Sequence, residues 1–418
     1  MSAAATGSKR SSFAEWLLPI AAVTLLAGHM SAAVACLSDH GVIPVKPRDF
    51  TLIFAGLSLV LVWFNRPSLS PAALFLLTIP VLRFTDAAAL KRYINVLDGD
   101  PNIAVMTLGS ILLVTTVALL VLCTAHGPLI VKRAAIVVIL LGTGSILYEA
   151  AGYAEYSQIP GRPAGFITQP NEAIIMVILM LGIVLTFNEG FWSSALIIAI
   201  AGIGVGVTLS RSGMLVFSLM VMAFVAANLR KNFTKLVIIV AATIPAVLAG
   251  FALLTQMASS RNFGTDKNAM DRVEAITGMF GGHTDKMESD ERMKDLRDGW
   301  EAVGSAPVFG HGTGCASSRW QPHNQWVAIW LDIGVGGVVL YGCTLPFLTA
   351  LCIKSGRGFF ALLPLWAFSV FSQNLVETAG YWLCAGVVAL VTTRMRFRLA
   401  LRSQPAATLP QPVTGRPF

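Results

Sequence analysis

Long apolar stretches are the feature that most limits what this chain can fold into. A helix needs roughly 20 apolar residues to cross about 30 Å of hydrocarbon, and the chain supplies runs of about that length repeatedly. Lipid offers no partner for a free backbone N–H or C=O, so the spanning segments are predicted to be helices. The sequence therefore predicts an all-α polytopic membrane protein with about 12 transmembrane helices, at residues 16–36, 50–65, 68–84, 103–123, 134–151, 172–188, 191–209, 213–229, 235–255, 325–353, 358–373 and 379–393.

Composition agrees with a membrane protein and excludes a large water-soluble core. The 418 residues are 55% hydrophobic and only 12% charged, whereas a soluble domain carries about 25% charged residues. The net charge of +8 is dispersed over short loops instead of being gathered in one patch, so it does not indicate nucleic-acid binding.

The distribution of charge predicts which side of the membrane each loop faces. With 12 spans, both termini share one side, and that side receives 15 Lys and Arg residues against two acids, Glu15 and Glu189. Short loops rich in Lys and Arg stay in the cytoplasm. We therefore expect helices 1–9 within residues 1–255, an outer loop at 256–324, helices 10–12 within 325–393, and a cytoplasmic tail at 394–418.

The outer loop is predicted to contain one helix, from about Asp290 to Val303. Its apolar residues recur at helical spacing and are expected to lie against the membrane domain; they are Met293, Leu296, Trp300 and Val303. Arg292 and Arg297 flank this stripe on opposite edges. Arg292 lies in the first turn, where a guanidinium and open backbone N–H groups together can hold phosphate. A solvated charge on the helix surface is the alternative for both arginines.

The end of the loop carries further candidate residues. Gly310, Gly312 and Gly314 alternate after Pro307, and such glycines permit positive φ and a close approach of the backbone to a phosphate or sugar, or simply a tight turn. His323 and Asn324 follow immediately before the tenth span. A histidine at the membrane interface can exchange a proton near neutral pH, although a histidine at such a position, taken alone, more often has a structural or interfacial role.

Two residues within the tenth span are further candidates. Asp332 is an ionisable residue in an apolar run, which is costly and usually functional, unless it bonds a neighbouring helix. Trp326 can stack on a sugar or anchor the helix at the interface.

Ser210-Arg211-Ser212-Gly213 separates two apolar runs with almost no loop between them. The predicted topology places this turn on the outer side, so Arg211 is expected at the depth of the lipid headgroups. An arginine that reaches ordinary lipid phosphate is the alternative interpretation.

In their order and placement, these motifs resemble the O-antigen ligase/polymerase superfamily, most closely O-antigen ligase, over residues of about 205 to 340. The resemblance implies a membrane glycosyltransferase that uses no metal or cofactor and acts outside the bacterial inner membrane on a glycan carried by undecaprenyl pyrophosphate. It also implies that Arg211 and Arg292 match the two arginines of the family and that His323 matches its essential histidine.

The chemistry of transfer fits these residue types. The leaving lipid diphosphate gains negative charge, which two arginines can stabilise, and neutral His323 can take the proton of the acceptor hydroxyl. Direct attack inverts the anomeric centre. The residues expected to bind substrate are Arg297, Gly310, Gly312, Asn324, Trp326 and Asp332.

Three functions follow as alternatives. The first is an O-antigen ligase that transfers polysaccharide to lipid A–core oligosaccharide in lipopolysaccharide biosynthesis. The second is an O-antigen or exopolysaccharide polymerase with the same donor. A third, from a different class, is a transporter of lipid-linked glycan, which the lack of internal sequence repeats disfavours.

Overall fold

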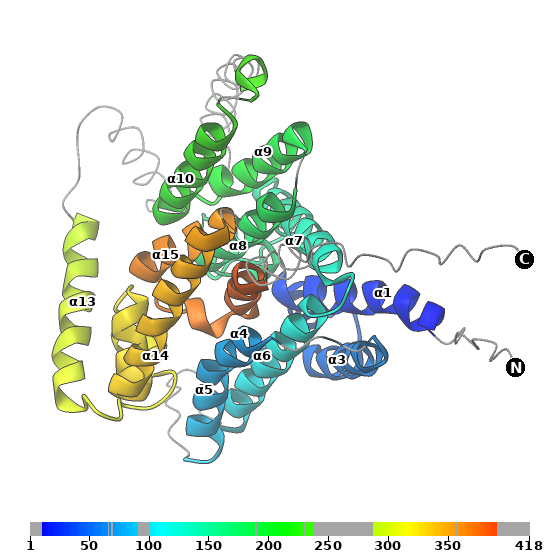
Figure 1. Cartoon of the computed structure of the whole chain (residues 1–418). Helices are drawn as coiled ribbons and strands as arrows, with labels where there is room; N and C mark the ends of the chain where they lie inside the picture. Colours follow the sequence, from blue (N-terminus) through cyan, green and yellow to red (C-terminus); the bar gives the residue numbers. More distant parts are fainter. Residues whose placement is uncertain are drawn as a thin grey trace, which may run out of the picture.

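The computed structural model describes residues 11–65, 67, 70–90, 101–159, 161–188, 190–229, 231–236, 287–355 and 358–390, which contain helices and turns but no strand. The helices (Figure 1) are α1 (Ser11–Met30), α2 (Ala33–Asp39), α3 (Pro47–Phe64), α4 (Pro71–Leu76), α5 (Thr78–Ala88), α6 (Pro101–Leu122), α7 (Gly127–Ala150), α8 (Pro170–Phe187), α9 (Phe191–Val207), α10 (Arg211–Asn228), α13 (Met287–Ser305), α14 (Gln325–Ser355) and α15 (Phe359–Phe371). Short turns η1 (Gly165–Ile167), η2 (Ala316–Trp320) and η3 (Leu375–Glu377) connect them, and a last apolar helix is Ala379–Leu390. The predicted all-α class is confirmed for these residues.

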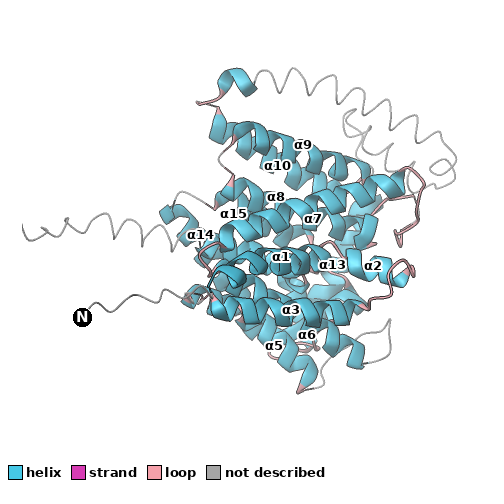
Figure 2. Ribbon diagram, turned by 90° about the vertical axis from the view of Figure 1, so that its right-hand side faces the viewer, coloured by secondary structure: helices cyan, strands magenta, loops and turns pink. Residues whose placement is uncertain are grey.

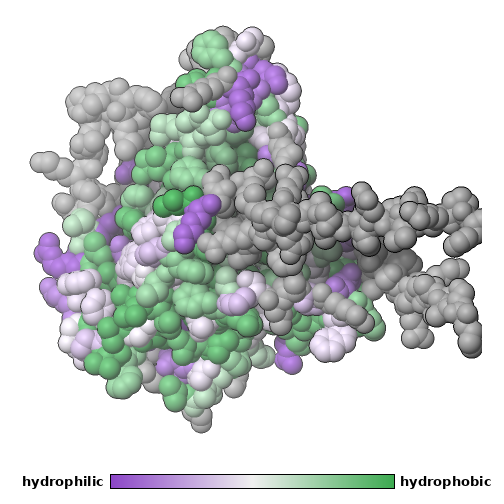
Figure 3. Space-filling model, viewed as in Figure 1, coloured by the Kyte–Doolittle hydropathy of each residue, from purple (hydrophilic) through white to green (hydrophobic). Residues whose placement is uncertain are grey.

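Most of these helices run side by side as one bundle, with α2 at one end of it (Figure 2). The central helix is α8, of which 78% is buried, and it packs against α7, α9, α10 and α15. Gly182 permits the contact with α15, because a Cβ there would lie 2.5 Å from the carbonyl oxygen of Phe360. Apolar side chains also cover much of the visible outer face (Figure 3), as expected for helices that face lipid.

Helices occupy every predicted span except the ninth, 235–255, most of which lies outside the described residues. Among those residues, seven helices are long and apolar enough to cross a membrane, or eight if the bent pair α1 and α2 forms one span. The remaining apolar helices, α9, α15 and Ala379–Leu390, are shorter. The chain is thus a helical protein with several candidate membrane spans, and the total of 12 stays a prediction. Residues 256–286 of the predicted outer loop and the tail 394–418 also lie outside the described part of the chain.

Two of the predicted spans are broken. The first ends at Met30, and α2 leaves it at an angle of 61° after Ala32, which has a φ of 53°. The tenth predicted span, 325–353, contains Gly334 with a φ of 73° and a ψ of −165°, so α14 consists of two helical halves. A left-handed φ cannot continue a right-handed helix. Both breaks fall inside apolar runs, where hydropathy gives no sign of them.

Candidate active site

The helix α13 is the predicted loop helix, and it packs on the first half of α14. The contact surface differs from the predicted stripe: Leu296 is partly buried and Val303 is buried, but Met293 and Trp300 are each 57% exposed. The physical reason is Gly299, because a Cβ there would lie 3.0 Å from the Cβ of Pro322. The helix therefore contacts the bundle most closely at Gly299, whose neighbour Trp300 points to a different side of the helix.

This orientation separates the two arginines of α13. Arg292 lies one turn before Asp295, on the face of the helix that is turned toward His323, and its side chain is half-buried. Arg297 is exposed and lines a groove of about 480 Å³ together with residues of α13 and the start of α14. The other lining residues are Met293, Leu296, Trp300, Asn324, Trp326 and Val327. The structure thus places Arg292 and Arg297 in different surroundings.

His323 is held by its backbone and faces α13 with its ring. Its φ is 48°, and its N–H donates to the side-chain oxygen of Gln373 at 2.7 Å. The Nε2 atom lies 3.7 Å from Oδ2 of Asp295, and both side chains are about one third exposed, at 36% and 33%. An accessible imidazole beside a carboxylate is suited to proton transfer.

Asn324 and Trp326 have contacts within the fold. The Asn324 side-chain oxygen accepts hydrogen bonds from the backbone N–H groups of Trp326 at 2.9 Å and Val327 at 3.2 Å. It therefore caps the N-terminus of α14. The Trp326 ring packs edge-on against Tyr341, with centroids 5.0 Å apart. Both residues also line the groove beside Arg297.

Arg211 is the first residue of α10, and the turn before it is built by its neighbours. Ser210 caps the helix by accepting from the N–H of Gly213. Gly213 lets α10 approach α8, since a Cβ there would lie 2.3 Å from a methyl group of Ile174. The hydroxyl of Ser210 also donates to Asn171 at 3.0 Å. The predicted tight turn is confirmed, and the two serines and the glycine of the motif surround a half-buried arginine.

A series of contacts links this turn to His323. Asn171, which binds Ser210, precedes Glu172, and Glu172 accepts from the side-chain amide of Asn374 at 3.0 Å. Asn374 follows Gln373, which holds the backbone of His323. Hydrogen bonds between sequence neighbours of these residues therefore connect the segment that carries Arg211 with the segment that carries His323, although the two are far apart in sequence.

Asp332 lies in a buried cluster of charges. One of its oxygens is 2.7 Å from a guanidinium nitrogen of Arg83, and the other accepts from the N–H of Ala316 at 3.0 Å. Arg83 is 3% exposed and also pairs with Glu377 at 2.6 Å. Burial raises the pKa of Glu377 to about 7, against the opposing effect of Arg83. Asp332 thus ties α5, α14 and the segment after α13 together.

The alternating glycines fit against the break in α14. A Cβ on Gly310 would lie 2.7 Å from the carbonyl oxygens of Leu331 and Asp332. The N–H of Gly312 donates to the carbonyl oxygen of Asp332 at 3.0 Å. On the other side of the break, Val335 donates to the carbonyl of Pro307 at 3.0 Å. The turn therefore supplies hydrogen-bond partners for backbone groups that the break in the helix leaves without an intrahelical partner. These glycines thus form a tight turn, which was the alternative to a binding site for phosphate or sugar.

A known protein family matches the part of the chain that carries these residues. Residues 195–342 match the family model described as O-antigen ligase. The superfamily predicted from the motifs is thereby confirmed, and the matched region includes Arg211, α13, the glycine turn, His323 and the first half of α14. No curated protein matches the chain.

Sequence reasoning missed two residues outside the matched region, 195–342, that contact it. Arg83 and Asp86 lie in α5, and Asp86 accepts from both the N–H and the hydroxyl of Thr313, at 3.0 and 2.9 Å. Their spacing of three residues within an apolar helix was the available signal, because charged residues in such runs are rare. Cys315, the lone loop cysteine, is buried beside this cluster, and burial raises the pKa of its thiol.

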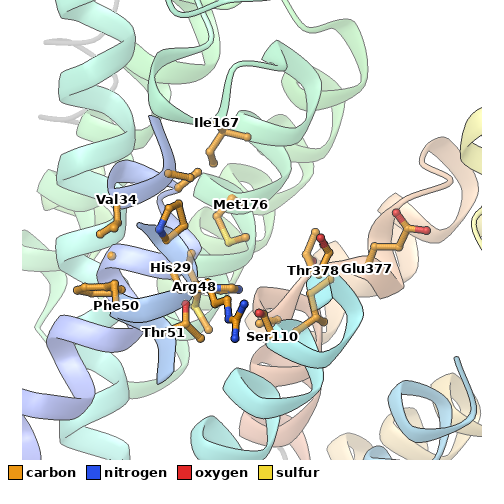
Figure 4. Close-up of a pocket in the computed structure, with 18 of the residues that line it drawn as sticks. His29, Val34, Arg48, Phe50, Thr51, Ser110, Ile167, Met176, Glu377 and Thr378 are labelled. Carbon is orange, nitrogen blue, oxygen red and sulfur yellow. The ribbon is translucent and has the colours of Figure 1, made fainter. Parts of the chain in front are cut away.

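A cavity of about 550 Å³ lies at the end of the bundle where α1 meets α2 (Figure 4). Its walls are mainly apolar and come from α1, α3, α6 and α8, with Phe50, Ser110 and Met176 among them. Glu172 and Glu377 also line it, so the cavity borders the contacts that hold His323. The described residues on its wall include neither Arg211 nor His323.

Proposed function

We propose that this protein is an O-antigen ligase, which transfers a polysaccharide from undecaprenyl pyrophosphate to lipid A–core oligosaccharide on the periplasmic side of the bacterial inner membrane. The observation that carries the proposal is the contact of His323 with Asp295 of α13, the helix that also carries Arg292, inside the region matched by the family model. The predicted orientation has both termini in the cytoplasm.

The two arginines are assigned to the donor. When the glycosidic bond breaks, the diphosphate oxygen keeps the electron pair, and its growing charge is stabilised by guanidinium groups that offer paired N–H donors. Arg211 is at the N-terminus of α10, where open backbone N–H groups also favour an anion. No metal ion is required in this assignment.

His323 is assigned as the general base. The acceptor hydroxyl gives its proton to the imidazole while its oxygen forms the new bond to the anomeric carbon, and the diphosphate leaves from the opposite face. Such proton transfer typically contributes about 10²–10⁴-fold to the rate. The product has the inverted anomeric configuration.

The groove beside His323 is assigned to the acceptor. Trp300 and Trp326 offer aromatic faces for sugar rings, and Arg297 offers a cation for a core phosphate. Asn324 lies at the edge of this groove and would orient the sugar through the N–H groups of its side-chain amide. This places the reacting hydroxyl next to His323.

Three substitutions test the assignment. We expect purified Arg211→Ala, Arg292→Ala and His323→Ala proteins to transfer glycan at least about 100-fold more slowly than the wild type, since each removes stabilisation of the transition state. The measurement is in vitro transfer from a defined undecaprenyl-pyrophosphate donor to lipid A–core.

Lys294→Ala is the matched control for α13, because Lys294 is an exposed cation on the same helix. It should retain normal activity. Wild-type rates for any of the three test variants would refute the assigned mechanism.

A polymerase is the second candidate, because it uses the same donor and the same chemistry. The products of a null strain separate the two. Long undecaprenyl-linked polymer without capped lipopolysaccharide identifies a ligase, whereas lipopolysaccharide that carries only single repeats identifies a polymerase.

The apolar cavity is assigned to part of the isoprenoid chain of the donor, because its walls are mainly apolar and it lies beside the Glu172 contact that leads to Arg211. We expect Ser110→Trp, which fills the cavity, to raise the donor KM at least about fivefold while the acceptor KM stays unchanged. Leu57→Trp, on an exposed position of α3, is the control. An unchanged donor KM in Ser110→Trp would remove this assignment.

A further inference from the structure

The structure places one carboxylate directly against the proposed base. Asp295 Oδ2 lies 3.7 Å from Nε2 of His323, which is an ion-pair distance and about 1 Å longer than a short hydrogen bond. Catalytic hydrogen bonds in ligand-free structures are often this long and tighten when substrate binds. Asp295 is otherwise an unfavourable neighbour for a diphosphate, so its position at this site needs a reason.

The position of Asp295 is fixed by packing. It lies one turn before Gly299, and that glycine brings α13 against Pro322, the residue before His323. The backbone of His323 is fixed from the other side by Gln373. The carboxylate and the imidazole are therefore each anchored, by two different parts of the chain, so that they face one another.

We propose that Asp295 is a positioning residue for His323: it accepts the Nε2–H of the imidazole, holds the tautomer in which Nδ1 is unprotonated, and stabilises the imidazolium that forms during transfer. The inference rests on the proposed function. The O–H bond of the acceptor breaks and its proton moves to Nδ1. The oxygen forms the bond to the anomeric carbon, and the electron pair of the broken C–O bond stays with the diphosphate.

Other charged groups on the elements around His323 are also relevant to its protonation. Arg292 lies on the same helix face as Asp295, and Arg319 precedes His323 in η2. Glu377 is in the turn that contains Gln373, where it pairs with Arg83. Glu172 of α8 binds Asn374. Asp295 makes an ion-pair contact with the ring, so its removal should change His323 directly.

Purified Asp295→Asn protein tests the proposal. Asparagine keeps the size of the side chain but not its charge, so the imidazolium loses stabilisation. We expect kcat to fall at least about tenfold with the donor KM within about twofold of the wild type. The acid limb of the kcat/KM profile should move to lower pH by about 0.5–1 unit, since a nearby opposite charge favours the protonated base. Asp295→Glu should recover part of the activity.

Asp298→Asn is the matched control, since Asp298 is an exposed acid on the same helix, and it should behave as the wild type. A second measurement does not need activity: the pH dependence of His323 modification by diethyl pyrocarbonate, followed by mass spectrometry of its peptide, should shift in the same direction in Asp295→Asn. Unchanged kcat, pH profile and modification would overturn the role of Asp295. If His323→Ala is inactive in the same assay, the proposed function survives that result, and if it is active, both fall.

Discussion

At the scale of single residues, the site combines groups that are marked in the sequence with groups that are not. Arg211 and His323 stand out because each interrupts or borders an apolar run within a short motif. Arg83 is marked only as a charge within an apolar run, because its partners Asp332 and Glu377 are distant in sequence and only the fold brings them within 2.7 Å. A buried charge is stable only with such partners, so its role is visible only in three dimensions.

At the residue scale, we predict that the stability of the protein depends on Arg83. We expect Arg83→Met to lower stability by about 3–5 kcal/mol, because it leaves buried carboxylates without their cation. The measurement is thermal unfolding of the purified protein in detergent. A variant that also carries Asp332→Asn and Glu377→Gln should recover part of the loss, as it removes the unpaired charges.

The control is Arg133→Met, which changes an exposed arginine on α7 and should leave the melting temperature unchanged. If the Arg83→Met protein has the same melting temperature as the wild type, the buried charge cluster around Arg83 contributes little to stability.

At the scale of helices, hydropathy located the spans but not their breaks. The run 325–353 predicts one continuous helix, and Gly334 divides it because the turn after α13 packs against its backbone. The loop helix was predicted near its observed position, and Leu296 and Val303 of its predicted apolar face pack inward, whereas Met293 and Trp300 stay largely exposed because the close contact with Pro322 is made by Gly299. Hydrophobic periodicity is read from apolar side chains, so it does not predict a contact that forms because a glycine has no side chain.

The break itself can be tested with Gly334→Ala. We expect this variant to be destabilised by at least about 1–2 kcal/mol, the approximate penalty for a left-handed backbone at a residue with a Cβ. The new Cβ would also lie 2.1 Å from the carbonyl oxygen of Val308. Thermal unfolding measures the loss.

Gly336→Ala serves as the control two residues away, where a Cβ would meet open space. It should be tolerated, since alanine also favours a helix. Equal melting temperatures for the two variants would mean that the left-handed conformation at 334 is not required.

At the scale of the whole molecule, the sequence predicted the helical class and the general order of spans, whereas the orientation rests on charge alone. Lys132 donates to Asn188 at 3.2 Å, which places the start of α7 beside the end of α8. This contact joins two loops predicted to be cytoplasmic, but it does not show which side of a membrane they face.

Cysteine labelling tests the orientation. In a background without native cysteines, Tyr153→Cys should react with an impermeant maleimide added to cells with a permeabilised outer membrane, because Tyr153 is exposed after α7. Lys231→Cys, after α10, should react only once the inner membrane is opened. The reverse pattern would place the active site in the cytoplasm and exclude the proposed acceptor.

In the proposed orientation, the break at Gly334 also sets the height of the proposed reaction above the bilayer. The second half of α14, from Val335 to Ser355, is about 30 Å long at 1.5 Å per residue, which equals the thickness of the hydrocarbon by itself. The first half then rises about 13 Å beyond it, through the zone of lipid headgroups. Under the proposed function, a long hydrophilic glycan would reach His323 without leaving water, while its lipid carrier would stay in the membrane.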